Sequence, residues 1–526
     1  MAAKGFNRII IIITTISAAI MELLDTTIVN VALNQMAGSL GATIEDVAWV
    51  VTSYAIANVI IIPMTGFLAE YFGRKTYYLA SMIIFTVASY FCGASEGLWE
   101  LVFWRFIQGV GGGALLSTSQ SILFDAFEPK DRPIASGLFG MGIVLGPTLG
   151  PTLGGLIVDN LTWSDIFYVN LPIGVLASIL TILFIEKKEG EGTRKKQIQI
   201  DYLGIFLLTA GIGSLQFILE KGESEDWFDS HLIILFTAVA IVGLISFVVW
   251  ELYTKHPVVN LKVLKHRTLA LTLIFTFVSG IGLFTSVFVY PVLVQRINGF
   301  TSTMTGLSLM FPTLIAIPMF PIIGKQMAKG ARPVPFIVVG FLLFIAFGIW
   351  AGTLSGDANM WDFFPAHLLR VLGISMLQLP LINQAVAGLQ PQEYPTGISL
   401  NNMVRQLGGA TGIAIANNYV TNRVAQHRSD LMSNMTSENP LFMERLNGIT
   451  NTMASRTGEF FSATQMAYRQ MEGMVMKQAY LLAYLDTFRI VSLFFIVIFP
   501  LIFLLRTPKK SQEEAQKAAL AAADSH

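Results

Sequence analysis

The chain has 526 residues, of which 53% are hydrophobic and 13% are charged, and its formal net charge is zero. Soluble domains carry about 25% charged residues, so this composition predicts an all-α protein that crosses a membrane several times. The apolar stretches are continuous, which excludes a transmembrane β-barrel, because barrel strands alternate apolar and polar residues. The single cysteine, Cys92, excludes an intrachain disulfide and a cysteine-based metal cluster.

Fourteen apolar stretches long enough to cross a bilayer follow one another along the chain. The first is too long for a signal peptide and contains two acids, so we expect it to be retained as a helix. The predicted spans are residues 9–33, 47–69, 76–95, 98–124, 134–158, 164–185, 202–220, 231–253, 269–294, 304–327, 334–354, 363–389, 396–421 and 483–506.

The positions of Lys and Arg predict the orientation of these spans. Nearly all basic residues lie in alternate connections, and the short connections on the other side hold only Lys221 and Arg296. By the positive-inside rule, both termini are therefore expected in the cytoplasm. The long external connection 424–482 is polar and rich in Met, and it predicts two amphipathic helices separated at Asn439 and Pro440. These helices could form a folded cap or a docking surface for a partner.

An internal repeat divides the chain into two related sets of six spans. The repeated residues have the same spacing in both sets, and they are Pro63, Gly66 and Arg74 in the first and Pro321, Gly324 and Arg332 in the second. Arg105 with Gly109 in the fourth span loosely matches Arg370 with Gly373 in the twelfth. We therefore predict an N-terminal half (1–185), a linker with two extra spans (186–268), a C-terminal half (269–506) and a tail (507–526). Paired halves are typical of secondary transporters.

Two acidic residues, Glu22 and Asp25, lie inside the first span. A charged residue at the middle of a membrane helix costs about 2.5–3.5 kcal/mol, so such residues usually serve as ion or proton sites. A structural contact between helices is the alternative. Arg105 lies inside the fourth span and requires a partner, for which a carboxylate or polar backbone on the first span is the expected candidate. A purely structural salt bridge is the alternative for this residue.

Two further motifs suggest moving parts. Small residues recur along the fifth span at the spacing of a helix face and predict close packing against another helix: Gly142, Gly146, Gly150 and Gly154, with Pro147 and Pro151 between them. The connection after the second span contains Gly66, Glu70, Gly73, Arg74 and Lys75, and its glycines permit a tight turn. The chain lacks a phosphate-binding loop and the motifs of metal or nucleophilic enzymes. We therefore predict no enzyme activity and no cofactor, and an ion gradient as the energy source.

These motifs resemble those of the major facilitator superfamily. The connection after the second span is similar to the G-x-L-A-D-R-x-G-R-K loop of that superfamily, and Arg105 with Gly109 is similar to its R-x-x-x-G motif. The doubled Gly-Pro pattern of the fifth span and the stretch from Leu24 to Leu33 resemble the fourteen-helix drug:proton antiporters of the EmrB/QacA type. The resemblance implies two six-helix halves with two inserted helices.

The resemblance also implies an activity, namely proton-driven export of lipophilic or amphipathic compounds across a bacterial inner membrane. Asp25, Glu22 and Arg105 would couple protons, and the glycine, proline and charged residues of the two moving parts, with Gly109, would control the conformational change. Expected partners are lipophilic substrates, protons, and a periplasmic membrane-fusion adaptor with an outer-membrane channel; nucleic acid is not expected.

The substrate cavity is expected to be lined by polar residues on several spans. The candidates are Asn30, Tyr54, Asn58, Gln378, Asn402 and Arg405. Hydrogen bonds between helices are the alternative role for these side chains. Two other functions compete with drug export: transport of one specific metabolite, and a sensor or scaffold that transports nothing.

Overall fold

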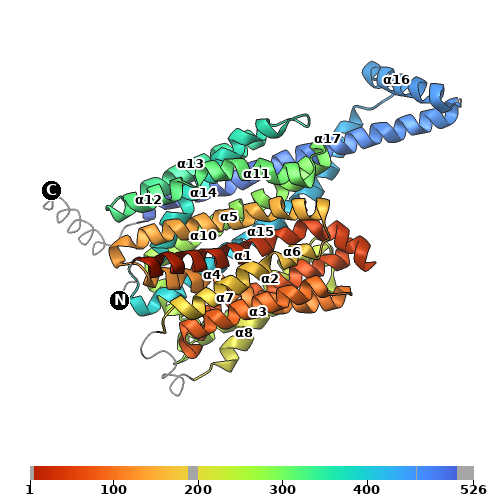
Figure 1. The fold of residues 1–526 in the computed structure, drawn as a ribbon. Helices are drawn as coiled ribbons and strands as arrows, with labels where there is room; N and C mark the ends of the chain where they lie inside the picture. Colours follow the sequence, from red (N-terminus) through yellow and green to blue (C-terminus); the bar gives the residue numbers. More distant parts are fainter. Residues whose placement is uncertain (1–4, 188–198, 458, 506–526) are drawn as a thin grey trace.

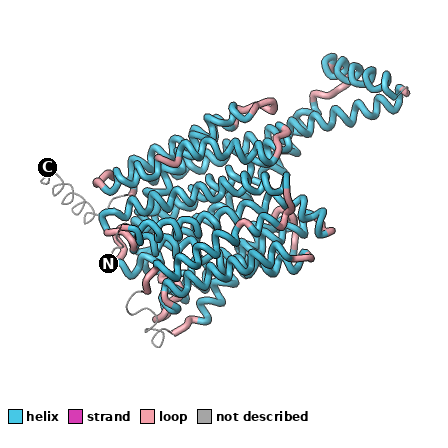
Figure 2. Tube along the Cα trace, in the orientation of Figure 1, coloured by secondary structure: helices cyan, strands magenta, loops and turns pink. Residues whose placement is uncertain are grey.

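The protein is a bundle of long helices, shown by a computed structural model (Figure 1). The structure describes residues 5–187, 199–457 and 459–505, and these ranges contain helices and loops but no strand (Figure 2). The predicted tail 507–526 lies outside the described residues.

The helices of the N-terminal half and the linker match most of the predicted spans. They are α1 (Phe6–Leu40), α2 (Ile44–Phe72), α3 (Arg74–Ala94), α4 (Leu98–Asp125), α5 (Arg132–Asn160), α6 (Asp165–Tyr168), α7 (Asn170–Phe184), α8 (Tyr202–Lys221) and α9 (His231–Tyr253). Short 3-10 helices join them at η1 (Pro129–Asp131), η3 (Trp227–Asp229) and η4 (Leu261–Lys265).

The C-terminal half is built from the remaining helices. They are α10 (Arg267–Leu293), α11 (Ser302–Ala316), α12 (Met319–Ala328), α13 (Pro333–Ala351), α14 (Met360–Val386), α15 (Tyr394–Ser433), α16 (Pro440–Thr457) and α17 (Phe460–Ile498). A π-helical segment η5 (Val294–Asn298) follows α10, and the 3-10 segments η6 (Pro391–Glu393) and η7 (Phe499–Leu504) lie before α15 and after α17.

The bundle has two distinct ends. The helix α1 begins at one end, which we call the terminal face, and α16 with the adjoining parts of α15 and α17 extends beyond the other, which we call the projection face (Figure 1). Successive long helices alternate in direction between these faces. Residues that lie far apart in the chain therefore meet at the same depth of the bundle.

Twelve helical segments of the described chain are long and apolar enough to cross a membrane. The chain is therefore a multi-pass membrane protein. The predicted spans 98–124 and 396–421 coincide with α4 and α15, which are more polar than these twelve. Each of them carries a buried arginine, Arg105 on α4 and Arg405 on α15.

Two predicted elements differ from the observed ones. The predicted span 304–327 is divided into α11 and α12 near Pro318, because proline lacks the N–H that would continue the helical hydrogen bonds. The connection 424–482 does not form the two separate helices that were predicted. Instead α15 continues to Ser433 and α17 begins at Phe460, with α16 between them. The predicted break at Asn439 and Pro440 coincides with the start of α16.

Both halves contain a seam of small residues where two helices pack closely. In the N-terminal half, the glycines of α5 face α1, and a Cβ atom added at Gly146 would lie 2.5 Å from the Cβ of Leu23. In the C-terminal half, a Cβ added at Gly412 of α15 would lie 2.9 Å from the Cα of Ile281 on α10. The two seams occupy equivalent positions in the repeat, which supports a common architecture for the halves.

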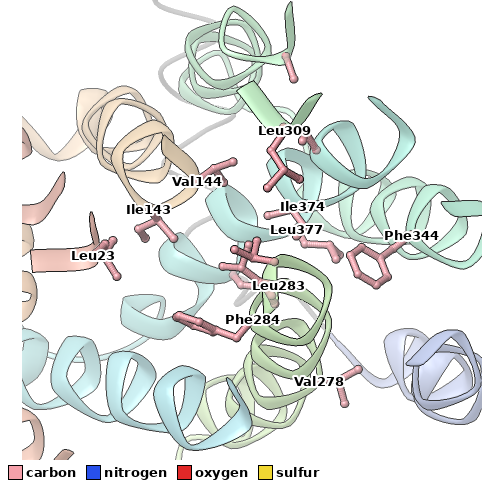
Figure 3. Packing of buried hydrophobic residues seen from close by; sticks show 14 of the residues in the cluster. Leu23, Ile143, Val144, Val278, Leu283, Phe284, Leu309, Phe344, Ile374 and Leu377 are labelled. Atoms are coloured by element: carbon pink, nitrogen blue, oxygen red, sulfur yellow. The ribbon is translucent and has the colours of Figure 1, made fainter. Parts of the chain in front are cut away.

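The apolar core joins both halves. Figure 3 shows buried side chains of α1, α5, α10, α11, α13 and α14 packed together, among them Leu23, Ile143, Leu283, Leu309 and Phe344. The inserted helices α8 and α9 pack against each other at Gly211 and Gly243, beside this core. Lys221 at the end of α8 donates a 2.9 Å hydrogen bond to the carbonyl oxygen of Glu45, which attaches this helix to α2.

Candidate functional site

A buried carboxylate on α1 is the centre of the strongest polar network in the N-terminal half. The Asp25 side chain is fully buried, and its Oδ2 lies 2.5 Å from Nη1 of Arg105 on α4. Its Oδ1 accepts hydrogen bonds from Gln108 Nε2 at 3.0 Å and from Asn170 Nδ2 at 2.9 Å. The carboxylate therefore receives donors from two other helices, α4 and α7.

The arginine of this pair is held by several contacts at once. Arg105 Nε donates to the carbonyl oxygen of Val50 at 3.1 Å, and its guanidinium lies 4.2 Å from the ring centre of Tyr54. Its Nη1 also donates to Gln108 Oε1 at 2.8 Å. Because both charges are buried and hydrogen-bonded, they compensate each other, whereas removing one partner of such a pair costs about 3–5 kcal/mol.

Three polar residues of this network were not among the predicted site residues. Gln108 and Asn170 each donate a 3.1 Å hydrogen bond to Ser89 Oγ, and Ser89 in turn donates to the carbonyl oxygen of Phe167 at 2.9 Å. Gln108 could have been found, because it lies one helical turn after Arg105 and thus on the same face. Nothing in the local sequence around Ser89 and Asn170 indicates that they meet.

The second acid of α1 has different partners. Glu22 is buried, and its Oε1 accepts a 2.9 Å hydrogen bond from Asn58 Nδ2, while its Oε2 has no hydrogen-bond partner among the described residues. Arg405 of the C-terminal half attracts Glu22 electrostatically, and its three guanidinium nitrogens likewise have no hydrogen-bond partner in the described chain. Glu22 and Arg405 thus attract each other across the two halves, although no hydrogen bond or ion pair joins them within the described residues.

The six predicted cavity residues lie in different environments. Asn30 is exposed on the part of α1 nearer the projection face, and the other five are buried. Gln378 donates to Ser279 Oγ at 2.9 Å within the C-terminal half. Asn402 donates to Ser117 Oγ of α4 at 3.0 Å and so joins the halves. The structure brings Tyr54, Asn58 and Arg405 close to the acids of α1, but it places Gln378 and Asn402 in hydrogen bonds between helices.

The predicted turn after α2 lies at the terminal face. Gly73 has φ of 85°, a conformation that favours glycine, and it separates α2 from α3. Arg74 forms an ion pair with Asp125 at the end of α4, and Lys75 Nζ donates to the carbonyl oxygen of Ile182 at 2.8 Å. Asp125 was not predicted as a partner of this turn. Glu70 is exposed in the last turn of α2.

Apart from Gly73 in its turn, the glycines of the predicted moving parts lie at helix contacts. Gly66 faces Pro395 and Thr396 at the start of α15, and Gly109 faces the backbone of Tyr54 on α2. The α5 residues contact α1, and this set comprises Gly142, Gly146, Pro147, Gly150 and Gly154, with Pro151 buried on the same helix. The helix that carries both acids is therefore the helix against which the smooth face of α5 packs.

Contacts between the halves differ at the two faces. Near the terminal face, α4 meets α15 through Asn402, and α5 meets α14 through Ser136, whose hydroxyl donates to Asn383 Oδ1 at 2.9 Å. Near the projection face, α5 meets α11, where Thr303 Oγ1 donates to Asp159 Oδ2 at 2.9 Å. Several helices of each half thus close the terminal face.

Comparisons with known proteins agree with this arrangement. Residues 15–413 match the model of the Major Facilitator Superfamily. This chain belongs to the major facilitator superfamily. It is 33% identical over 463 residues to the multidrug export protein EmrB of Escherichia coli (strain K12), with 86% of this chain and 89% of the relative covered. It is 31% identical to the fatty acid resistance protein FarB of Neisseria gonorrhoeae, with 93% and 94% covered.

A solved structure supports the fold independently of close sequence similarity. The human organic anion transporter MFSD10 has a TM-score of 0.58 at 14% identity, with 95% of this chain and 100% of that chain covered. The resemblance seen in the sequence motifs is therefore confirmed at the level of the family. The chain is an EmrB-like transporter of this superfamily and not an enzyme.

Proposed function

We propose that this protein is a proton-coupled exporter of lipophilic and amphipathic compounds in a bacterial inner membrane. The observation that carries the proposal is the buried contact of Asp25 with Arg105, Gln108 and Asn170. Placing a carboxylate inside a membrane costs free energy, and acids in this position commonly carry ions or protons. The EmrB name of a relative supports drugs as the cargo.

The proposed topology has fourteen spans and two cytoplasmic termini. The alternation of helix directions supports α4 and α15 as two further crossings beyond the twelve apolar segments. Basic residues of the described chain such as Lys75, Lys130 and Arg332 lie at the terminal face, which supports that face as the cytoplasmic one. The inserted helices α8 and α9 are the two spans in addition to the two six-helix halves.

The proposed cycle begins with the path open toward the projection face. The contacts of Asn402 and Ser136 at the terminal face support this starting state. Asp25 takes a proton from outside, which removes its charge and weakens its attraction to Arg105. The halves then rock, with the α5 seam moving along α1, and the proton leaves inside. Each inward elementary charge gains about 2.3 kcal/mol per 100 mV.

The Glu22 region is proposed as the place where substrate and proton compete. Glu22 Oε2 and the Arg405 guanidinium are buried polar groups with capacity for further hydrogen bonds. Asn30, Tyr54, Asn58, Gln378 and Asn402 would contribute polar contacts as the halves separate. A cavity with few strong ionic contacts and many apolar side chains would accept lipophilic substrates of varied shape.

The projecting helices are proposed to bind a periplasmic adaptor that continues to an outer-membrane channel. The exposed apolar side chains Leu441, Phe460 and Phe461 lie on or next to α16, with exposed fractions of 75%, 65% and 71%. Replacing residues 434–459 by a short Gly/Ser linker should preserve transport in vesicles but abolish resistance in cells. Unchanged resistance in cells would count against an adaptor.

Drug accumulation in everted membrane vesicles tests the proposed export. Vesicles energised to an acidic interior should accumulate a fluorescent lipophilic cation, and dissipating the pH gradient should release it. Asp25→Asn should abolish accumulation, whereas Glu100→Gln, which alters an exposed acid on the helix of Arg105, should not. Accumulation of one metabolite but no lipophilic compound would favour a specific transporter.

A further inference from the structure

A second buried basic cluster lies in the C-terminal half, away from the acids of α1. Arg370 and His367 lie one turn apart on α14, and both are only 1% exposed. Tyr290 and Ser286 of α10 lie next to them. The function proposed above uses none of these side chains.

The cluster lacks the negative charge that a buried arginine requires. The recorded hydrogen bond of Arg370 runs from Nη1 to Ser286 Oγ at 3.3 Å, which is long for an N–H···O bond. Its Nε and both ring nitrogens of His367 have no hydrogen-bond partner among the described residues. Within the same described residues, no Asp or Glu forms an ion pair with Arg370, and its recorded electrostatic neighbours are Tyr290 and His367.

The equivalent position in the N-terminal half does contain a carboxylate. Asp25 and Ser286 occupy the same position counted from the first residues of α1 and α10, Phe6 and Arg267. Each is hydrogen-bonded to the arginine of the matching helix, Asp25 to Arg105 and Ser286 to Arg370. The repeat therefore preserves the arginine but replaces its counter-charge by a hydroxyl.

Aromatic rings restrict what could complete this site. The rings of Tyr290 and His367 meet edge to face, with centres 4.1 Å apart, and Phe363 and Phe347 pack on other sides of His367. Such packing excludes a bulky head group. The edges of aromatic rings carry partial positive charge and favour a small anion. Water could satisfy the free donors but could not neutralise the guanidinium.

We propose that Arg370 and His367, which lie next to Ser286 and Tyr290, bind a small monovalent anion, with chloride as the probe that tests it. The anion takes the place in the C-terminal half that Asp25 has in the N-terminal half. It is held by the free Nε–H of Arg370 and by an N–H of His367. This site is independent of the proposed export, because it requires neither proton coupling nor a drug.

Thermal unfolding of the purified full chain tests for the anion. A ligand that binds only the folded protein stabilises it increasingly with concentration. Sodium chloride and sodium bromide should each raise Tm saturably above the value in sodium gluconate at equal ionic strength and pH. An equal Tm in chloride and gluconate would overturn the proposal.

Two variants locate the effect. In Arg370→Gln the chloride-dependent rise in Tm should disappear, whereas in Arg296→Gln, which alters an exposed arginine, it should remain as in the wild type. Ser286→Asp supplies a carboxylate like that of Asp25, so its Tm in gluconate should rise and lose its dependence on chloride. A full chloride effect in both Arg370→Gln and Ser286→Asp would place the anion elsewhere and overturn the assignment.

Bromide provides a direct measurement that does not depend on a variant that folds. Wild-type crystals grown in sodium bromide should show an anomalous peak between Arg370 and His367. Density without anomalous signal at this position would identify water and contradict the proposal. Loss of drug transport with the peak present would affect only the proposed export.

Discussion

The two halves of the transporter share their architecture and differ in how they treat a buried arginine. Arg105 is paired with Asp25 and supported by the backbone of Val50, whereas Arg370 has one long hydrogen bond to a hydroxyl. The small-residue seams between α1 and α5 and between α10 and α15 are alike. The difference teaches that the repeat preserves helix packing, while the buried carboxylates of the two halves, Glu22 and Asp25, both lie in the N-terminal half.

Removing each arginine in turn should give the largest difference between the halves. Arg105→Leu leaves Asp25 buried without its cation, so we expect a loss of about 3–5 kcal/mol in the free energy of unfolding. Arg370→Leu leaves no carboxylate behind, so it should cost far less in chloride-free buffer. Thermal unfolding of both purified variants in sodium gluconate measures this; equal losses would break the comparison.

The seams should be equally intolerant of added bulk in both halves. Gly146→Ala and Gly412→Ala each force an added methyl group against atoms at 2.9 Å or less, and overpacking costs about 1–3 kcal/mol. Gly38→Ala on α1 is the control, since no atom would lie within 4 Å of its added Cβ. Thermal unfolding and drug uptake should both be impaired in the first two variants and nearly normal in the control. If Gly412→Ala changed neither thermal unfolding nor drug uptake, the seam of the C-terminal half would be less tightly packed than that of the N-terminal half.

Removing a contact between the halves at the terminal face should change the conformational equilibrium moderately. Asn402→Ala removes the hydrogen bonds to Ser117 and Gln120, and a hydrogen bond of this kind contributes about 0.5–1.5 kcal/mol. The population open at the terminal face should therefore increase. Distances between spin labels on α4 and α15, in a Cys92→Ser background, measure the shift. An unchanged distance distribution would argue that other contacts hold this face closed.

Removing an exposed ion pair near the projection face should have the smallest effect on stability. Arg428 and Glu472 lie 2.8 Å apart, but their side chains are 45% and 56% exposed. Surface pairs contribute about 0–1 kcal/mol, so Arg428→Gln should change Tm little and transport in vesicles not at all. A loss comparable to that of Arg105→Leu would contradict the view that burial determines the strength of these pairs.

Much of the fold could be predicted from the sequence because membrane spans are long and apolar. The predicted stretches coincide with observed helices, and the repeated Arg74 and Arg332 lie at equivalent positions, where α3 and α13 begin. The continuation of α15 to Ser433 could not be predicted, because this part of the helix is polar and lacks a continuous apolar stretch. The break near Pro318 was equally hidden within one apolar stretch.

The site was predictable where charge stands out against an apolar background. Asp25, Glu22 and Arg105 are conspicuous for that reason, and the structure pairs Asp25 with Arg105. Asn170 and Ser89 are ordinary polar residues, and only the packing of α7 and α3 against α1 and α4 brings them to the carboxylate. Contacts between distant helices have no signature in a single sequence.

Proton movement driven by substrate tests the central claim most directly. Proteoliposomes with an acidic interior should lose their pH gradient when a lipophilic drug is added to the wild-type protein. Asp25→Asn should abolish this loss, and Glu22→Gln should weaken it, because Glu22 lies one turn away but does not contact Arg105. If drugs bind to the wild-type protein yet move no protons, the assignment of coupling to the N-terminal half is contradicted.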